Sequence, residues 1–465
     1  MERLLATKRT DGSLSKGQAF LSRATALIIL LPFFVISFFN HPLGDDYWST
    51  GMVRRLGFLH AQVELYNTVP PRWLALGLSC FSPLSWGNFW GYKVIPVVFL
   101  LLFIAAMAGL FRTLSGYSPG VTRKSCYELA ILFTAVFLSA APGIGGGIYW
   151  VSALIVFGIG LLLFVCWVNL LVMWYRGRRS RWVLAGIGVC FLAMAGSNEI
   201  ITVVSLVILG VVNLYRIRRK RGIDRATVLL LSLLGLSVGF VACFKGAPHR
   251  LALMQTTDSA KFWYSAGFSI LVSGFCVLKA LISPFCLAAL IAAYDPFIRW
   301  CRSVYGVQQE LLNAVSYFTA GWLFILFTIP FIVLYLSGLH PPYRVVNMVF
   351  FFQLIGLMYF GTRATRGRGP FAKFGQYRNI AVALLLISGF MCKNNVSIAV
   401  RELVSGNAYQ YDKEMNQRYQ LILKCRADSC VVPYLRHTSI TLRYDSADVN
   451  DFHISDYFQK KVIVR

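Results

Sequence analysis

The chain has 465 residues, of which 57% are hydrophobic and only 14% are charged, and its formal net charge is +26. Soluble globular domains usually carry a charge on about a quarter of their residues, so this composition excludes a soluble enzyme. The positive charge does not indicate a nucleic-acid partner, because the basic residues lie in short loops between long apolar runs. That placement is typical of loops that anchor a membrane protein against anionic lipid.

A polar, basic segment from Met1 to Gln18 precedes the first apolar run. That run lacks a small-residue cleavage site, so we expect a retained helix rather than a removed signal peptide. Apolar runs of about 20 residues can cross a bilayer as helices. We therefore predict an all-α polytopic membrane protein with about eleven transmembrane helices. The predicted spans are Phe20–Phe39, Val94–Phe111, Tyr127–Ala141, Trp150–Tyr175, Trp182–Ala195, Ile200–Tyr215, Ala226–Phe244, Phe268–Tyr294, Tyr317–Leu336, Val345–Gly361 and Ile380–Met391.

The distribution of lysine and arginine predicts which side of the membrane each loop faces. With a cytoplasmic N-terminus, about 25 of the 45 basic residues fall in the N-terminus and cytoplasmic loops, and about 7 fall in external loops. Cytoplasmic loops of membrane proteins carry this excess of positive charge. Eleven crossings then leave the C-terminal tail on the external side. We divide the chain into a transmembrane domain, residues 1–392, and an external C-terminal domain, residues 393–465.

The first external loop, about residues 40–93, is long enough to have structure and a task of its own. It begins with an acidic pair, Asp45 and Asp46, followed at once by Tyr47 and Trp48. One interpretation is a turn after a span, with the two aromatic rings in the membrane interface. The other is a catalytic carboxylate. Further along the loop, the segment Trp73–Leu84 is too short to cross a bilayer and is predicted to be an interfacial helix.

Other polar and aromatic side chains are predicted at the same membrane face. In "GSNEI", Glu199 is either a helix-start carboxylate favoured by the dipole or a second acidic group of the site. In "GIGGGIYWVSA", Tyr149 and Trp150 are either interfacial residues or a platform for a sugar or lipid. The glycines are not a phosphate loop, because no GK[ST] sequence follows them.

Several cations are candidates for binding a phosphate. In "KGAPHR", Lys245, His249 and Arg250 are either a solvated turn or a set of donors for charge-assisted hydrogen bonds. Arg344 in "HPPYR" lies at the external start of a span, where positive charge is disfavoured, which favours an anionic partner. Lys279 is predicted about eleven residues inside a span, a depth at which an amine indicates either function or a structural ion pair.

The tail is long and polar enough for a small α/β unit. Its "SCVVPYL" sequence predicts a strand because it contains a β-branched run. Cys425 and Cys430 would lie outside the cytoplasm, where disulfides persist, so we expect them to be bridged. The remaining cysteines are mostly in apolar segments, where cysteine behaves as a small hydrophobic residue, and none has zinc-ligand spacing.

Carboxylates and cations on one membrane face suggest the transfer of a sugar from a lipid phosphate to an acceptor. A carboxylate near the acceptor hydroxyl acts as a general base, and positive groups stabilise the charge that grows on the leaving phosphate. The motifs "GDDYW", "IYWVSA", "GSNEI", "PPYR", "YQYDKEMNQRYQLILKC" and "DVNDFHISDYF", in this order, resemble the GT-C superfamily of integral membrane glycosyltransferases. Within it the likeness is to bacterial serotype-converting O-antigen glucosyltransferases and their uncharacterised relatives.

The resemblance implies a GT-C-like fold in the bacterial inner membrane and an inverting transfer. The donor would be a polyprenyl (undecaprenyl) phosphate hexose, by resemblance glucose, and the acceptor a cell-surface glycan, lipid-linked or free. One of Asp45 and Asp46 would be the general base. Arg72 would orient the loop or bind phosphate. No metal site is implied, although Asp46 with Glu199 could hold one divalent cation.

Two other functions compete with this one. A transporter or flippase of lipid-linked sugars would explain the many spans and Lys279, and it predicts polar groups that line a path through the membrane midplane. A membrane acyltransferase would need a membrane-embedded histidine, whereas the six histidines of the chain lie in loops or in the tail. Membrane lipid is an expected partner in every case, and nucleic acid is not.

Overall fold

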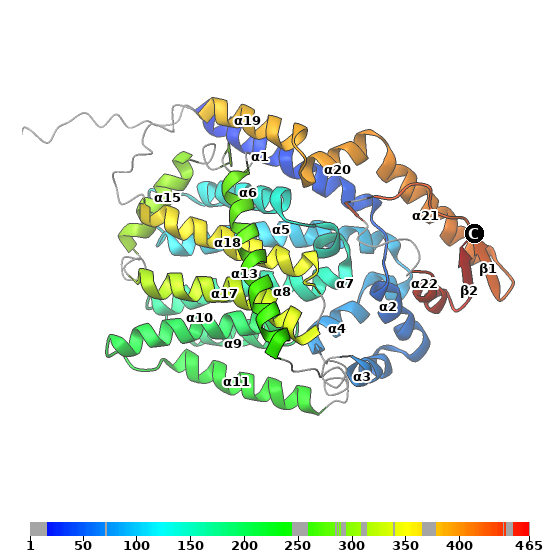
Figure 1. Ribbon diagram of the computed structural model, residues 1–465, viewed down its shortest axis with the longest axis horizontal. Coiled ribbons are helices and arrows are strands. Elements are labelled where there is room, and N and C mark those ends of the chain that lie inside the picture. Colours follow the sequence, from blue (N-terminus) through cyan, green and yellow to red (C-terminus); the bar gives the residue numbers. More distant parts are fainter. Residues whose placement is uncertain are drawn as a thin grey trace, which may run out of the picture.

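The computed structural model describes residues 16–69, 72–243, 259–283, 286, 288–289, 294–307, 314–337, 340–364, 378–439, 441–442 and 450–464. Within them the chain is mainly helical, and Figure 1 shows the long helices stacked as a bundle with shorter helices at its ends. The long helices are α1 (Lys16–Ile36), α5 (Phe89–Leu114), α6 (Arg123–Ala140), α8 (Ile159–Tyr175), α9 (Arg181–Ala195), α10 (Glu199–Arg218), α11 (Arg225–Ala242), α13 (Ser259–Ile282), α17 (Val315–Ser337), α18 (Tyr343–Ala364) and α19 (Arg378–Met391).

Seven of the described helices are long and apolar enough to cross a membrane, and an eighth span is possible if α19 and the following α20 (Asn395–Val404), bent by 61°, count as one. The seven are Phe89–Leu114, Val151–Tyr175, Glu199–Arg218, Arg225–Ala242, Lys261–Lys279, Val315–Leu336 and Tyr343–Arg363. The chain is therefore an all-α multi-pass membrane protein by length and composition. The predicted count of eleven does not have this support.

The predicted spans that fall short do so for two reasons. The helix Arg181–Ala195 is shorter than 18 residues, and so is the apolar stretch Ala24–Phe39, which covers the later part of α1 (Lys16–Ile36) and the 3₁₀ turn that follows it. The third, α6, is 18 residues long, but its first two turns include Arg123, Lys124 and Glu128. These charges would have to lie at the edge of the hydrocarbon layer or be paired there.

A further correction concerns Lys279. The predicted span Phe268–Tyr294 is replaced by an earlier one, because α13 begins at Ser259 and its apolar part ends at Lys279. Lys279 thus lies in the last turn of α13 and not deep inside a span. At a helix end the long side chain of lysine can extend its amine towards the polar interface.

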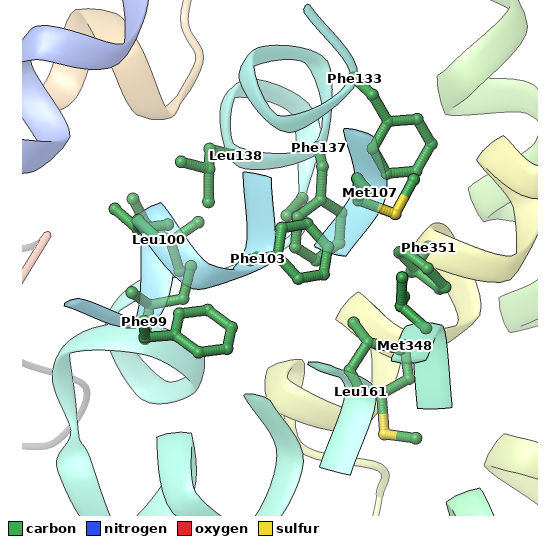
Figure 2. Close-up of a cluster of buried hydrophobic side chains, with 14 of the residues drawn as sticks. Phe99, Leu100, Phe103, Met107, Phe133, Phe137, Leu138, Leu161, Met348 and Phe351 are labelled. Carbon is green, nitrogen blue, oxygen red and sulfur yellow. The ribbon is translucent and has the colours of Figure 1, made fainter. Parts of the chain in front are cut away.

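The centre of the bundle is a cluster of aromatic and aliphatic side chains from four helices. Figure 2 shows Phe103 of α5 near Phe137 of α6 and Phe351 of α18, with Leu161 of α8 closing the group. The ring centroids of Phe103 and Phe137 are 6.1 Å apart, as are those of Phe103 and Phe351. Aromatic pairs at such distances contribute about 0.5–1.5 kcal/mol beyond the burial of their area. This packing fixes α5 and α18, which both carry residues of the candidate site.

The first loop and the tail form one end of the molecule. In Figure 1 the short loop helices α2 (Asp45–Leu56), α3 (Phe58–Thr68) and α4 (Trp73–Cys80) share that end with α7 (Val151–Ala153) and the tail, whereas α15 (Tyr294–Val307) is at the opposite end. Two 3₁₀ turns, Ser37–Phe39 and Pro83–Trp86, lead into α2 and α5. Two π-helical turns, Gly145–Tyr149 and Leu154–Gly158, flank α7. Such π-turns are frequent at functional sites.

The tail continues from α20 through α21 (Asn407–Lys424), strand β1 (Ser429–Val432), α22 (Asn450–Phe458) and strand β2 (Lys461–Val464). The two strands pair in parallel, with Cys430 opposite Val462. A disulfide joins Cys425 to Cys430, with 6.0 Å between their Cα atoms.

The last helix packs directly on the loop helix that carries the acidic pair. A Cβ atom at Gly51 of α2 would be 3.0 Å from the Cα atom of Tyr457 in α22. Gly51 is therefore required for this close approach, and the tail forms part of the site end of the protein.

Candidate functional site

The Asp46 carboxylate is fully buried and accepts four hydrogen bonds. Oδ1 accepts one from the Ser152 amide at 2.7 Å and one from the Ser152 hydroxyl at 2.5 Å. Oδ2 accepts one from the Leu43 amide at 2.9 Å and one from the Tyr92 hydroxyl at 2.7 Å. Burial raises the pKa of this carboxyl to about 6, and the four hydrogen bonds oppose the rise. Asp46 thus joins α2 to α5 and to the turn after Trp150.

Asp45 has the opposite environment. Its side chain is exposed at the start of α2. Within the described part of the chain, no hydrogen bond occupies its carboxylate. Neighbouring protein nevertheless removes enough hydration to raise the pKa of Asp45 above its usual value, while the electrostatic influence of His453 and Arg344 acts to lower it. Of the two acidic residues, Asp45 is the one with a carboxylate available to a ligand.

Arg344 is held beside the acidic pair by the turn that follows α6. Its guanidinium carbon lies 5.0 Å from the centre of the Trp150 ring and 5.6 Å from that of Phe157. Aromatic faces at this range attract a cation. The start of α18 is fixed by Asn347, whose amide donates to the Gly143 carbonyl at 2.6 Å and accepts from the Gly143 amide at 3.2 Å. This pair of hydrogen bonds joins two elements that are 204 residues apart in the sequence.

Tyr149 has a different position from the one its motif suggests. The ring is completely buried, and its hydroxyl donates to the Phe33 carbonyl at 2.8 Å. Its carbonyl accepts from the Asn40 amide at 2.6 Å. Tyr149 therefore holds the end of the first helix against the glycine-rich turn and does not offer a face to a sugar. Trp150 is half-buried, with Arg344 over it.

The predicted residues Arg72 and Glu199 form an ion pair. Arg72 Nε donates to both carboxylate oxygens of Glu199, at 2.9 and 3.0 Å. The pair joins α4 to the first turn of α10. The adjacent turn is fixed as well, because the amides of Leu74 and Ala75 donate to the Gly196 carbonyl at 2.9 and 3.1 Å.

This junction explains the glycine of "GSNEI". A Cβ atom at Gly196 would be 2.2 Å from the ring of Trp73, so only glycine fits there without a rearrangement of α4. Both members of the Arg72–Glu199 pair are partly exposed, with 28% and 53% of their side chains accessible. They lie at the same end of the molecule as Asp45.

A second polar network ties the first loop to the tail. Buried His41 contacts Asp412 of α21 through Nε2 at 2.9 Å and the Tyr419 hydroxyl through Nδ1 at 3.1 Å. The Tyr419 hydroxyl is in turn 2.7 Å from the Tyr47 hydroxyl, and Lys93 forms an ion pair with Asp412. Burial lowers the pKa of His41 to about 4. The imidazole is therefore neutral at physiological pH, with Nε2–H donating to Asp412 and Nδ1 accepting from Tyr419.

No protein-family model, curated protein or solved structure matches the chain. The chemistry of the site is therefore argued from this geometry alone. The exposed Asp45 carboxylate, the Arg344 guanidinium and the Trp150 indole ring lie at one end of a bundle of membrane helices. This set can accept a proton from a hydroxyl and can stabilise an anion.

Three of the predicted phosphate-binding residues, Lys245, His249 and Arg250, lie outside the described residues. In the described part of the chain, no group of three or more His, Cys, Asp or Glu side chains could hold a metal ion. The two carboxylates suggested for a divalent cation are both engaged: Asp46 accepts four hydrogen bonds and Glu199 accepts two.

Some residues of this end were not identified from the sequence. His453 faces Asp45 from α22, although it is separated from it by almost the whole chain. Of the side chains that donate to Asp46, Tyr92 has no local motif, and Ser152 lies in the "IYWVSA" motif but was not singled out there. For His453 there was a signal, because it is a histidine in the helical "NDFHISDYF" segment next to the aromatic pair Tyr457 and Phe458.

Proposed function

We propose that the protein is a GT-C-type glycosyltransferase. It moves a hexosyl group, by resemblance a glucosyl group, from a polyprenyl phosphate to a hydroxyl of a cell-surface glycan such as O-antigen. The reaction takes place at the external face of the bacterial inner membrane and inverts the anomeric carbon. The observation that carries the proposal is the contrast between Asp45, which is exposed and without a hydrogen bond in the described chain, and Asp46, which is buried and saturated.

Each residue then has a defined role in the transfer. The acceptor hydroxyl oxygen attacks the anomeric carbon while its proton passes to the Asp45 carboxylate. The bond from the anomeric carbon to the phosphate oxygen breaks, and the electron pair leaves with the polyprenyl phosphate. Arg344 and Arg72 stabilise the growing charge on that phosphate. Asp46 positions α2, and Trp150 forms part of the surface on which the sugar lies.

The membrane contributes to catalysis by positioning. The polyprenyl tail stays in the bilayer beside the helical bundle, so the donor phosphate is confined to the depth at which the loop helices lie. The proposal takes eleven crossings, with the N-terminus in the cytoplasm and the tail outside. Three further helices would cross in this proposal: α6 packs along α5, α9 packs along α8 and α11, and α1 packs along α6, α19 and α20.

The decisive experiment compares Asp45→Asn with Asp46→Asn in membranes supplied with a radiolabelled polyprenyl-phosphate hexose and the acceptor glycan. We expect Asp45→Asn to lower the rate of transfer by about 10²- to 10⁴-fold, the usual contribution of a general base, without changing the amount of folded protein. Glu64→Gln, an exposed carboxylate of α3, is the matched control and should transfer at the wild-type rate.

Full transfer by Asp45→Asn would refute this mechanism. Movement of the labelled lipid across the membrane without a new glycosidic bond would instead support the transporter function.

A further inference from the structure

The tail contains a polar recess that the proposed reaction does not use. It has a volume of about 360 Å³ and lies where α20 turns into α21, closed on one side by the segment after β1. Ligand pockets span about 300–1,000 Å³, so this recess suits a small ligand of one or two rings. Its lining includes Arg401, Glu402, Asn407, Gln410 and His437.

Three contacts hold the walls of the recess in place. Buried Glu402 accepts from the Ser439 hydroxyl at 2.8 Å. The Asn407 amide donates to the Thr438 carbonyl at 2.8 Å. His437 Nδ1 lies 2.6 Å from a carboxylate oxygen of Glu414. These contacts fix the wall before any ligand arrives, which lowers the entropy lost on binding.

Other polar groups of the recess remain available. Arg401 is exposed and Gln410 is half-buried, and within the described chain neither side chain has a hydrogen-bond partner. The guanidinium offers donors only, whereas the Gln410 amide offers both donors and an acceptor. His437 adds its Nε2 atom and Asn407 its Oδ1 atom. The recess therefore presents mixed donors and acceptors to its occupant.

This mixture selects the class of ligand. A hydroxyl group both donates and accepts, so a polyol satisfies such a wall in full. A strongly anionic ligand is disfavoured, because the Glu402 carboxylate beside Arg401 would repel it. A lipid chain would leave the polar groups unpaired at a cost in free energy. A neutral saccharide fits both the size and the chemistry of the recess.

The recess also has a fixed position relative to the candidate site. Asn395, at the start of α20, donates to the carbonyls of Leu138 and Ala141 at 2.7 and 2.8 Å. Asp412 of α21 is joined to His41 and Lys93 of the first-loop region. A glycan bound in the recess would thus be held on the same rigid end of the protein as Asp45.

We propose that this recess is a saccharide-binding subsite in which the tail holds a neutral sugar unit of the acceptor glycan. The assignment of the ligand as the acceptor rests on the proposed function, whereas the binding of a saccharide does not. The expected effect of the subsite is on the KM for acceptor, because the recess contacts sugar units away from the reacting hydroxyl.

The test uses the full chain in detergent and the polysaccharide released by mild acid from the envelope of the source cells. Binding is measured by calorimetry without donor, and transfer is measured separately. We expect the double variant Arg401→Ala with Gln410→Ala to weaken binding at least tenfold and to raise the KM for acceptor without changing kcat or the KM for donor. Arg426→Ala, an exposed arginine elsewhere on the tail, is the control and should bind normally.

The outcomes separate this inference from the proposed function. Unchanged binding in the double variant would overturn the subsite, and so would displacement of the polysaccharide by inorganic phosphate, which would identify an anion site. Loss of binding in the double variant, with wild-type protein that binds the polysaccharide but transfers nothing, would support the subsite and refute the transferase. Asp45→Asn should bind the polysaccharide as the wild type does and fail only in transfer.

Discussion

Asp45 and Asp46 are neighbours in the sequence, but successive side chains leave an α-helix about 100° apart. That angle gives the two carboxylates different surroundings: Asp46 turns into the protein towards Ser152 and Tyr92, and Asp45 remains exposed. The sequence located the pair, but it could not distinguish its members. The two side chains that donate to Asp46, Tyr92 and Ser152, are 46 and 106 positions away, which no local pattern reveals.

The electrostatics of Asp45 give the first prediction. The positive charge of Arg344 acts to lower the pKa of Asp45, and the base must be ionised, so activity rises as pH rises through that pKa. Replacing Arg344 with alanine removes the charge and should move the acidic limb of the kcat/KM profile to higher pH. Arg344→Lys keeps a positive charge at this position and should return the acidic limb to its wild-type pH. The control is Arg55→Ala, an exposed arginine of α2; an acidic limb that stays in place in Arg344→Ala would contradict the assignment.

The hydrogen bonds of Asp46 give the second prediction. Each of its oxygens accepts one backbone amide, Ser152 on Oδ1 and Leu43 on Oδ2. In Asp46→Asn one of these positions becomes an NH₂ group that faces an N–H donor, whichever way the amide is turned. We expect a loss of stability of about 1–3 kcal/mol, the cost of a buried donor left unpaired, seen as a lower Tm of the purified protein. Asp45→Asn should keep the wild-type Tm, and equal Tm values for the two variants would contradict this role.

At the scale of elements, what could be predicted from the sequence was mostly local. Runs of apolar residues located α5, α8, α10 and the other long helices, because length and hydropathy are properties of a contiguous segment. They did not locate the start of α13, where Trp263 and Tyr264 extend the helix towards its N-terminus. The contact between the first loop and the tail could not be predicted either, because His41 and Asp412 are 371 positions apart in the sequence.

The contact between His41 and Asp412 gives the third prediction, which concerns the dependence of stability on pH. The pKa of His41 falls from 6.5 in an unfolded chain to about 4 in the folded protein, so the folded state binds fewer protons between these values. Stability contributed by neutral His41 is present above pH 6.5 and is lost as the pH falls towards 4. The lowered pKa of Asp412 acts in the same direction at lower pH.

Asp46, whose pKa is raised, acts in the opposite direction, so the test compares variants rather than one curve. The Tm of wild type should fall more steeply between pH 7 and pH 5 than that of His41→Gln, although the variant is less stable at pH 7. His60→Gln, an exposed histidine of α3, should keep the wild-type slope. If Tm changes equally with pH in wild type and in His41→Gln, then His41 does not cause this loss of stability at low pH.

At the scale of the whole molecule, the bundle separates two ends of different character. The loop helices, the acidic pair and the tail share one end, and α15 lies at the other. The end opposite the acidic pair also contains the arginine-rich turn before α11, where buried Asp224 lies 3.6 Å from Arg216 and 3.9 Å from Arg179. The distribution of positive charge predicts that this end faces the cytoplasm. The proposed reaction requires the other end to face outward.

The fourth prediction tests this orientation directly. Because α22 packs on α2 at Gly51, the tail and Asp45 must lie on the same side of the membrane, so labelling the tail also locates the acidic pair. The number of crossings between Asp45 and the tail must therefore be even, which excludes the seven spans from Phe89 to Arg363 alone. With the N-terminus inside, eleven crossings that begin with α1 leave both the tail and Asp45 outside, whereas eight crossings without α1 would leave both inside. After mild reduction of spheroplasts, a membrane-impermeant maleimide should label Cys425 and Cys430, as read by peptide mass spectrometry. An engineered Lys220→Cys in the turn before α11 should react only once the membrane is permeabilised, and the reverse pattern would place Asp45 in the cytoplasm, away from an external acceptor glycan.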